Sequence, residues 1–201
     1  MIAIIDYDGG NYKSVINILN RSKIQFILTN DKKEILKCKN IILPGVSNFD
    51  YCMKKLKSLN LDKILYEAVI VNKKKILGIC SGMQVLGSYS EEGNVKGLNF
   101  VNGTVKKIKS DKYFKVPHMG WNKEDTKKND LFKDIKDMTR FYFCHSYHFS
   151  SNDKNLKTNM TNYKFDICAA FNYANIYGVQ FHPEKSYIEG SKLINNFYEI
   201  S

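Results

Sequence analysis

The first half of the chain alternates short, mostly apolar runs with amphipathic stretches, and this alternation constrains the fold more than any other feature. Four runs are predicted to be strands: "IAIID" (2–6), "IQFIL" (24–28), "NIILPG" (40–45) and "KKILGI" (74–79). Helices are expected between them, one beginning at about Asn11 and two covering about 48–71. Strands that are apolar on both faces and alternate with helices predict an α/β fold with a mostly parallel central sheet and helices on both faces.

The second half has a different texture and is mostly β from about 98 to 181. Its strongest strand candidates are "RFYFCHSYHF" (140–149), "FDICAAF" (165–171) and "IYGVQF" (176–181), followed by a final helix at about 189–199. No repeat or linker divides the chain, and 201 residues with 43% hydrophobic content suffice for one sizeable core. We therefore expect a single domain, residues 1–201, with a β-rich C-terminal half.

Composition and charge disfavour several classes of function. The formal net charge is +11, but of the 31 basic residues only Arg21 and Arg140 are arginine, on which base readout and phosphate clamps rely. Scattered lysines are typical of a solvated surface, a functional basic surface being the alternative, and no nucleic acid is expected as a partner. The N-terminal residues are not expected to form a signal peptide, and no run of ~18 apolar residues is present, which favours a cytoplasmic protein with no membrane partner. Five cysteines without a CxxC pair predict neither a disulfide framework nor a zinc site.

A candidate nucleophile lies in "KKKILGICSGMQVLG", residues 73–87. Cys80 stands between Gly78 and Gly82 in a G-x-C-x-G pattern, where an apolar strand passes into a helix-like stretch. A sharp strand-to-helix turn needs small neighbours and lifts the side chain clear of the sheet. The backbone N–H of Ser81 and the start of the following helix would favour a thiolate and then an oxyanion. A buried cysteine at a tight turn is the alternative, because the pattern is short.

A candidate base lies about a hundred residues further on, in "YGVQFHPEKS" (177–186). His182 and Glu184 follow an apolar strand, and Pro183 between them holds the chain extended, so both side chains can point the same way. A cysteine facing a histidine that a carboxylate orients is an arrangement used for acyl transfer. Taken alone, His-Pro-Glu could also be a capped turn with a solvated glutamate. Together, Cys80, His182 and Glu184 favour catalysis.

These motifs resemble a known family. "GICSGMQ" and "FHPE" are similar to the class I glutamine amidotransferases, whose cysteine attacks the side-chain amide of glutamine and releases ammonia. More narrowly, the chain resembles the glutaminase subunits of imidazole glycerol phosphate synthases in "DYDGGN", "LPGVSNF", "GICSGMQVLG", "EEGNVKGL", "VPHMGWN", "FYFCHSY" and "IYGVQFHPEKS". The match runs in order along nearly the whole chain, and "PHMGWN" and "GVQFHPEKS" are its most specific parts. The resemblance implies the three-layer fold of the family.

The resemblance also implies roles for single residues. The catalytic set would be Cys80 as nucleophile, His182 as general base and then acid, and Glu184 as the group that orients the imidazole. The oxyanion hole would combine the Ser81 N–H with the backbone around Gly45 and Val46. Glutamine would be held by Gln84, Glu92, Ser146 and Tyr147, with Glu92 at its α-ammonium group and the Ser146 and Tyr147 backbone at its α-carboxylate. Gln84 could instead be an exposed helix residue, and Glu92 a loop carboxylate.

A third set of residues is assigned to a partner interface. The resemblance places Trp121 there, and more weakly Tyr142 and Lys185, although Trp121 could also be a core residue. The remaining histidines, His118, His145 and His148, are expected to be structural, because none has metal-ligand spacing to another histidine or a cysteine. No metal and no cofactor is expected.

The resemblance implies a glutaminase subunit that passes ammonia to a (β/α)₈-barrel cyclase subunit in a heterodimer, for histidine biosynthesis. Two positions depart from the family pattern: Ser81 stands where leucine is usual after the cysteine, and Ser47 where glycine is usual after "PGV". Ser81 keeps its N–H, but Ser47 replaces a residue able to take φ > 0, which bears on a peptide flip that would switch the site on. A paralogue that supplies ammonia to a sugar-modifying amidotransferase remains an alternative, and a silent scaffold is a further one, which the intact catalytic set disfavours.

Overall fold

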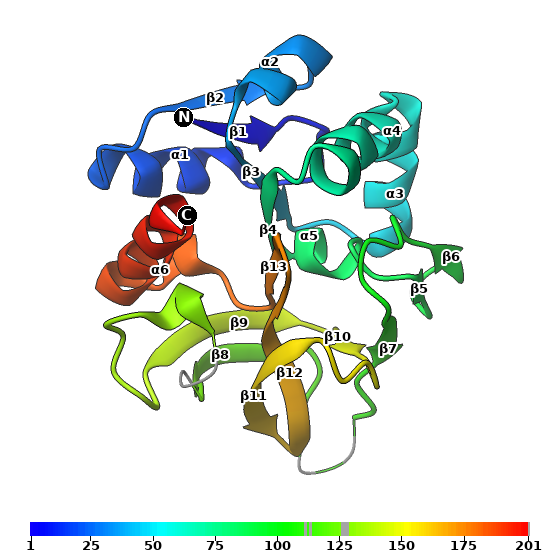
Figure 1. The fold of residues 1–201 in the computed structure, drawn as a ribbon. Coiled ribbons are helices and arrows are strands. Elements are labelled where there is room, and N and C mark those ends of the chain that lie inside the picture. The colour runs from blue at the N-terminus through cyan, green and yellow to red at the C-terminus, as the bar shows by residue number, and fades with distance from the viewer. Residues whose placement is uncertain (111, 113, 126–128, 201) are drawn as a thin grey trace.

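A seven-stranded sheet in the order β11-β12-β13-β4-β3-β1-β2 forms the centre of the molecule (Figure 1). The computed structural model describes residues 1–110, 112, 114–125 and 129–200. The parallel strands are β1 (Ile2–Ile5), β2 (Phe26–Thr29), β3 (Asn40–Gly45), β4 (Lys75–Cys80) and β13 (Ile176–Val179). The antiparallel strands at one edge are β12 (Phe165–Tyr173) and β11 (Lys157–Tyr163). The predicted mostly parallel sheet is confirmed.

Helices cover both faces of this sheet. One face carries α1 (Tyr12–Arg21) and α6 (Tyr187–Glu199). The other carries α2 (Lys32–Lys37), α3 (Phe49–Ser58), α4 (Leu61–Leu65), a π-helix (Tyr66–Val71) and α5 (Ser81–Gln84). Strand β1 shows why both faces must be covered, because Ile2 and Ile4 pack in the core under α1 and α6 while Ala3 and Ile5 pack in the core under α3 and α4. The result is the expected three-layer α/β arrangement.

Two smaller sheets lie beside the carboxyl ends of β4 and β13 (Figure 1). One has four strands, in the order β10 (Tyr147–Ser150), β7 (Thr104–Lys107), β5 (Tyr89–Ser90) and β6 (Val95–Lys96). The other pairs β8 (His118–Lys123) with β9 (Arg140–His145). Short 3₁₀ helices span Asp130–Phe132 and Pro183–Lys185. The run 140–149, expected as one strand, is two strands in different sheets. Its first part, β9, pairs with β8, and after Ser146 its second part, β10, pairs with β7.

The other elements differ from expectation mainly in their ends. The helical region 48–71 is three segments, and it breaks at Asn60, whose φ of 55° lies outside the helical range. The helix-like stretch after Cys80 is one turn, and α6 begins at Tyr187, two residues earlier than expected. Helix α2 was not expected.

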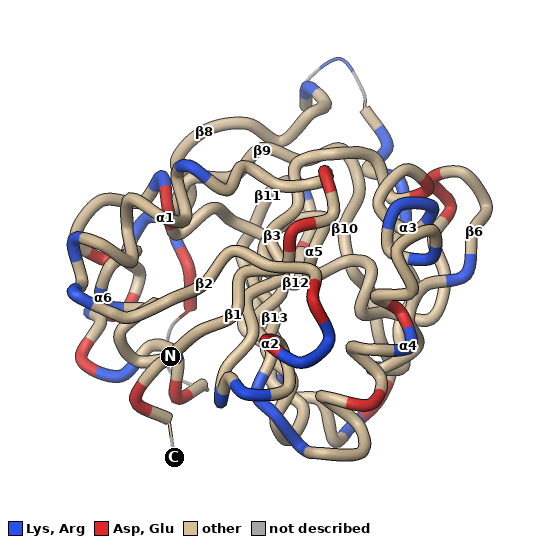
Figure 2. Tube along the Cα trace, turned by 90° about the horizontal axis from the view of Figure 1, so that it is seen from above, with Lys and Arg blue, Asp and Glu red and all other residues tan. Residues whose placement is uncertain are grey.

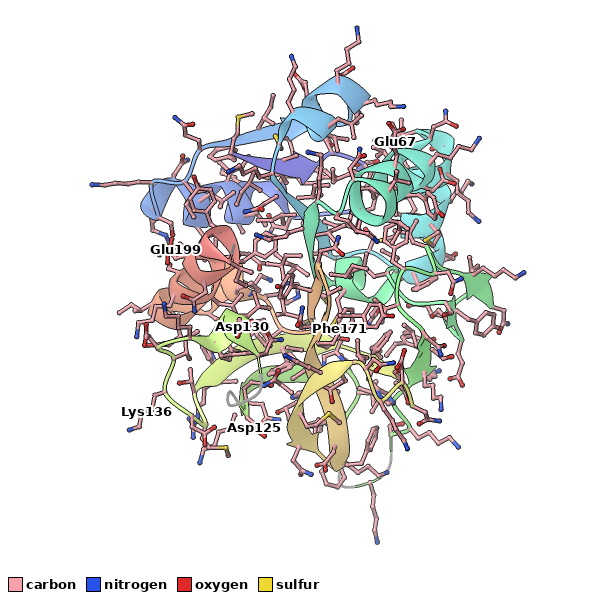
Figure 3. The ribbon with its side chains drawn as sticks, viewed as in Figure 1. Glu67, Asp125, Asp130, Lys136, Phe171 and Glu199 are labelled. Atoms are coloured by element: carbon pink, nitrogen blue, oxygen red, sulfur yellow. The ribbon has the colours of Figure 1, made fainter. Side chains whose placement is uncertain are left out.

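The surface agrees with the solvated-lysine interpretation. Lysine and arginine segments lie around the whole outline of the view in Figure 2, with acidic segments between them, and form no single stripe. Figure 3 shows the contrast with the interior, where Phe171 lies near the centre while Glu67 and Lys136 lie toward the outline. Within the described part of the chain, no helix has both the length and the apolar character needed to cross a membrane.

Candidate active site

Cys80 is held on a strained turn at the carboxyl end of β4. Its φ of 53° and ψ of −113° are unusual for a residue with a side chain, and α5 begins at the next residue, Ser81. The chain can turn this tightly only beside glycines, because a methyl group on Gly82 would collide with the carbonyl of Leu43. A methyl group on Gly78 would come within 2.6 Å of the Gly82 carbonyl oxygen. The small residues of the G-x-C-x-G pattern are therefore needed for close backbone packing.

His182 and Glu184 reach the same end of the sheet from the neighbouring strand. Strands β13 and β4 are parallel and in register, so the segment that follows β13 emerges beside Cys80. The His182 Nδ1 lies 2.8 Å from Glu184 Oε1, and both side chains are almost fully buried. This contact leaves Nε2 as the imidazole nitrogen available to Cys80, the neighbouring group that contributes most to the raised pKa of His182. The structure thus brings the three predicted catalytic residues together.

The electrostatics of His182 suit a base paired with a thiolate. Burial by itself lowers the pKa of this imidazole. The charge and hydrogen bond of Cys80, with the hydrogen bond and charge of Glu184, more than offset burial and raise the pKa to about 10. An imidazolium at this position stabilises an adjacent thiolate nucleophile.

A pocket of about 240 Å³ opens beside Cys80, a volume suited to a small molecule. The predicted residues that line it are Val46, Cys80, Ser81, Gln84, Glu92, Ser146 and Tyr147. Gln84 is buried and donates from Nε2 to the Tyr147 carbonyl and to Gln180 Oε1, each at 2.9 Å, so its interpretation as an exposed helix residue is wrong. Burial raises the pKa of the Glu92 carboxyl, and the N–H of Phe49, which donates to it at 2.9 Å, partly offsets that effect.

The predicted oxyanion hole has only one side in place. Ser81 is the first residue of α5, so its N–H has no acceptor within the helix. The N–H of Val46 is instead donated to the Gly9 carbonyl at 2.9 Å. Gly45 packs directly against the Ser81–Gly82 peptide, and Ser47 has a negative φ. In this conformation, Val46 does not offer its N–H to the reacting carbonyl.

Gln180 is a site residue that the sequence analysis missed. Its side chain is fully buried, donates to the Cys80 sulfur at 3.6 Å and accepts from Gln84. Its backbone continues the sheet by donating to the Ala169 carbonyl at 2.7 Å. A polar residue inside the apolar run "IYGVQF" was the available signal, because a buried amide needs polar partners.

The residues assigned to a partner interface form one exposed cluster. The Trp121 and Tyr142 rings meet edge to face at 6.0 Å, and the Lys185 ammonium lies 5.5 Å from the centre of the Tyr142 ring. Trp121 is 43% exposed, so its interpretation as a core residue is wrong. The cluster is larger than expected, because Tyr187 stacks on Trp121 at 5.3 Å and Ile188 beside it is 72% exposed.

The remaining histidines lie on neighbouring strands. His118 and His145 are buried and lie 2.9 Å apart through their ring nitrogens, while His148 contacts Phe165 edge to face at 5.0 Å. Within the described ranges, no three or more histidine, cysteine, aspartate or glutamate side chains are grouped so that they could hold a metal ion.

Known proteins of one kind are similar to this chain over its full length. The sequence profile described as "Glutamine amidotransferase class-I" matches residues 3–200. The "Imidazole glycerol phosphate synthase subunit HisH 2" of Methanococcus maripaludis is 46% identical over 98% of both chains. The subunit HisH of Leptospira borgpetersenii is 42% identical over 100% of both. A solved glutamine amidotransferase covering 98% of this chain and 97% of its own has a TM-score of 0.78 at 14% identity, which supports the fold.

Proposed function

The chain belongs to the class I glutamine amidotransferase family, and we propose that it is the glutaminase subunit of an imidazole glycerol phosphate synthase. The observation that carries this proposal is the meeting of Cys80, His182 and Glu184 at the ends of two adjacent parallel strands, beside a pocket for a small molecule. The HisH relatives favour this function over a sugar-pathway paralogue. The silent scaffold is disfavoured because the catalytic set is intact and assembled.

The reaction proceeds in two acyl-transfer steps. The Cys80 thiolate attacks the side-chain amide carbon of glutamine, and His182 gives its proton to the leaving nitrogen, so that ammonia departs and a glutamyl thioester remains. His182 then takes a proton from water, which attacks the thioester, and glutamate and the thiolate are released. Glu184 holds the imidazole through Nδ1 and stabilises its charged form. In both steps the oxyanion is stabilised by the Ser81 N–H and, once the Val46 peptide has turned toward the pocket, by the Gly45–Val46 backbone.

Glutamine is held by polar groups that line the pocket. The Glu92 carboxylate suits its α-ammonium group, and the backbone of Ser146 and Tyr147 suits its α-carboxylate. Gln84 and Gln180, joined by a hydrogen bond, link the Tyr147 carbonyl to the Cys80 sulfur. No cofactor takes part in this chemistry.

Ammonia released into water would be protonated and lost as a nucleophile, so the chemistry favours a docked acceptor enzyme. We propose a (β/α)₈-barrel cyclase as the second subunit of a cytoplasmic heterodimer. It uses the ammonia to convert a ribulosyl-aminoimidazole carboxamide ribonucleotide into imidazole glycerol phosphate. The exposed cluster of Trp121, Tyr142, Lys185 and Tyr187 would form the docking surface.

The acceptor is tested by product formation. We expect this chain, mixed with a histidine-pathway barrel subunit, to form imidazole glycerol phosphate with glutamine as the only nitrogen source. Added ammonium salt should support the barrel subunit alone, which separates failure of the acceptor step from failure of the glutaminase. If glutamate release were stimulated by a sugar-pathway barrel subunit and by no histidine-pathway one, the function would move to the paralogue.

Glu184→Gln should slow glutamine hydrolysis by roughly 10²-fold without abolishing it. His182 can still accept a proton, but a neutral amide 2.8 Å from Nδ1 no longer stabilises the imidazolium. The measurement is kcat for glutamate release by the complex with its barrel partner. Glu199→Gln, at the exposed end of α6, is the matched control and should leave kcat unchanged. An unchanged kcat for Glu184→Gln would remove Glu184 from the mechanism.

Trp121→Ala should weaken binding of the barrel subunit by about tenfold or more, because exposed aromatic side chains commonly dominate interface energies. Its stack on Tyr187 and its edge contact with Tyr142 would be lost together. The dissociation constant is measured by titrating the partner. Tyr66→Ala removes an aromatic side chain of similar exposure from the π-helix on the other side of the sheet and should not change binding. Equal effects of the two variants would argue against this docking surface.

A further inference from the structure

Two buried histidines that the mechanism does not use lie next to the active site. His118 and His145 are directly opposite each other in the antiparallel pair β8 and β9, which run side by side in Figure 1. Their rings meet through His118 Nδ1 and His145 Nε2 at 2.9 Å. His145 also lines the pocket beside Cys80, whereas His118 lies between the rings of Phe143 and Tyr163.

The chemistry of the neighbouring groups sets the direction of this contact. The Tyr147 carbonyl oxygen can only accept a hydrogen bond, so His145 Nδ1, 2.8 Å away, must carry a proton. A neutral imidazole has only one such proton, which leaves His145 Nε2 as an acceptor. His118 Nδ1 must then be the donor in the contact between the two rings. Both histidines are therefore assigned the Nδ1–H tautomer.

The hydrogen bond on the other side of His118, to Asn122, agrees with this direction. With its proton on Nδ1, His118 has an acceptor at Nε2, and Asn122 Nδ2 lies 3.4 Å from it. The same Asn122 amide donates to the Asn162 carbonyl on β11 at 2.9 Å, which confirms that its nitrogen faces this side. Burial lowers the pKa of His118 to about 4 and, with the charge of His118 as a smaller contribution, that of His145 to about 3. Both rings are neutral near pH 7, as is required if each ring donates one hydrogen bond and accepts another.

The hydrogen bonds that run from Asn122 through His118 and His145 end on the Tyr147 carbonyl, beside the pocket. The Tyr147 carbonyl accepts from His145 Nδ1 on one side and from Gln84 Nε2 on the other, so both of its lone pairs are used. Ser146 and Tyr147 form the crossing from β9 to β10, where the Ser146 carbonyl accepts from the Ile108 N–H at 2.9 Å and Tyr147 is the first residue paired with β7. The two side-chain donors add to these backbone contacts by fixing the Tyr147 carbonyl at the first residue of β10.

We propose that His118 and His145 are positioning residues for glutamine, forming with Asn122 a one-directional hydrogen-bond relay that fixes the Ser146–Tyr147 backbone at the substrate α-carboxylate. This inference rests on the proposed glutaminase function for its substrate. Because the relay acts on a binding group and leaves Cys80 and His182 untouched, its loss raises the KM for glutamine more than it lowers kcat.

The first test separates the hydrogen bond from the packing of the His118 ring. His118→Phe keeps a ring between Phe143 and Tyr163 but removes the donor to His145. His118→Asn loses the ring but keeps an amide N–H close to the position of Nδ1. In the complex with the barrel subunit, we expect KM to rise about fivefold for His118→Phe, with kcat changed less than about twofold, and to stay near wild type for His118→Asn. The melting temperature should follow the opposite order, because the ring packing is lost only in His118→Asn.

A matched control lies on the adjacent strand. His148→Phe makes the same substitution at a histidine that packs on Phe165 outside the relay, and it should leave KM unchanged. The proposal is overturned if His118→Phe leaves KM unchanged, if KM follows the melting temperature across the variants, or if the His148 control raises KM equally.

The second test does not depend on activity. In the isolated wild-type chain with ¹⁵N-labelled histidine, nitrogen chemical shifts should report the neutral Nδ1–H tautomer for both His118 and His145. In His118→Phe, His145 should keep its Nδ1–H, because the Tyr147 carbonyl still accepts from it, but its Nε2 signal should shift because Nε2 loses its donor. An Nε2–H tautomer at either ring of the wild type would overturn the relay. If no barrel subunit elicited glutaminase activity, the proposed function would fail and the tautomers alone would decide the relay.

Discussion

Cys80→Ser is expected to abolish glutamine hydrolysis, with a fall in kcat of at least about 10⁴-fold, while the fold remains intact. A serine hydroxyl is far less readily ionised than a thiol, so the imidazolium at His182 would face a neutral and weak nucleophile. The side chain is nearly isosteric, and the strained turn is determined by Gly78 and Gly82 and not by the sulfur. The measurement is glutamate release by the complex with its barrel subunit, with the melting curve as the check on folding.

The other cysteines provide the controls for this prediction. All five cysteines are free thiols, and Cys38 lies at the end of α2, outside the pocket. Cys38→Ser should therefore keep its activity, and a glutamine analogue that alkylates the active site should label Cys80 alone. A Cys80→Ser protein that keeps a large share of the wild-type rate would show that another group is the nucleophile.

The sequence predicted the central sheet well because its strands are buried on both faces. Strands β1, β3 and β4 are continuous apolar runs, and few other structures bury such runs on both sides. Helix α2 was missed because four of its six residues are charged and only Ile35 is buried, which leaves almost no periodic signal. The break at Asn60 and the change of sheet at Ser146 depend on backbone conformation and strand pairing, which side-chain patterns do not report.

The candidate site was predictable to the extent that its residues lie in local motifs. Cys80 and the pair of His182 and Glu184 each form a short pattern, and the structure brings them together because β4 and β13 are neighbours. Gln180 and Tyr187 could not be placed, since their contacts with Cys80 and Trp121 exist only in the folded chain. Of the histidines expected to be structural, His118 and His145 are buried and neutral near pH 7, but their contact with each other follows only from the pairing of β8 with β9.

The isolated chain is expected to be a poor glutaminase that the barrel subunit activates by about 10²–10³-fold, the rate commonly lost with one oxyanion-hole donor. The physical reason is the Val46 N–H, which is donated to the Gly9 carbonyl and so cannot stabilise an oxyanion beside Cys80. Docking can switch the site on if it favours a conformation in which this peptide turns toward the pocket. Val46 is 53% exposed, so the peptide is free of tight packing on one side.

Ser47 makes this activation testable within the chain itself. If the turned Val46–Ser47 peptide needs φ > 0 at Ser47, that conformation is about 1–2 kcal/mol less favourable for serine than for glycine. Ser47→Gly should therefore raise the rate of the isolated chain by about fivefold or more and reduce the stimulation by the partner in proportion. Ser58→Gly, at the end of α3 and away from the pocket, should change neither rate. Glutamate release is measured with and without the barrel subunit. Full activity without any partner would show that the Gly9 contact does not limit the rate, and the hole would then be complete without docking.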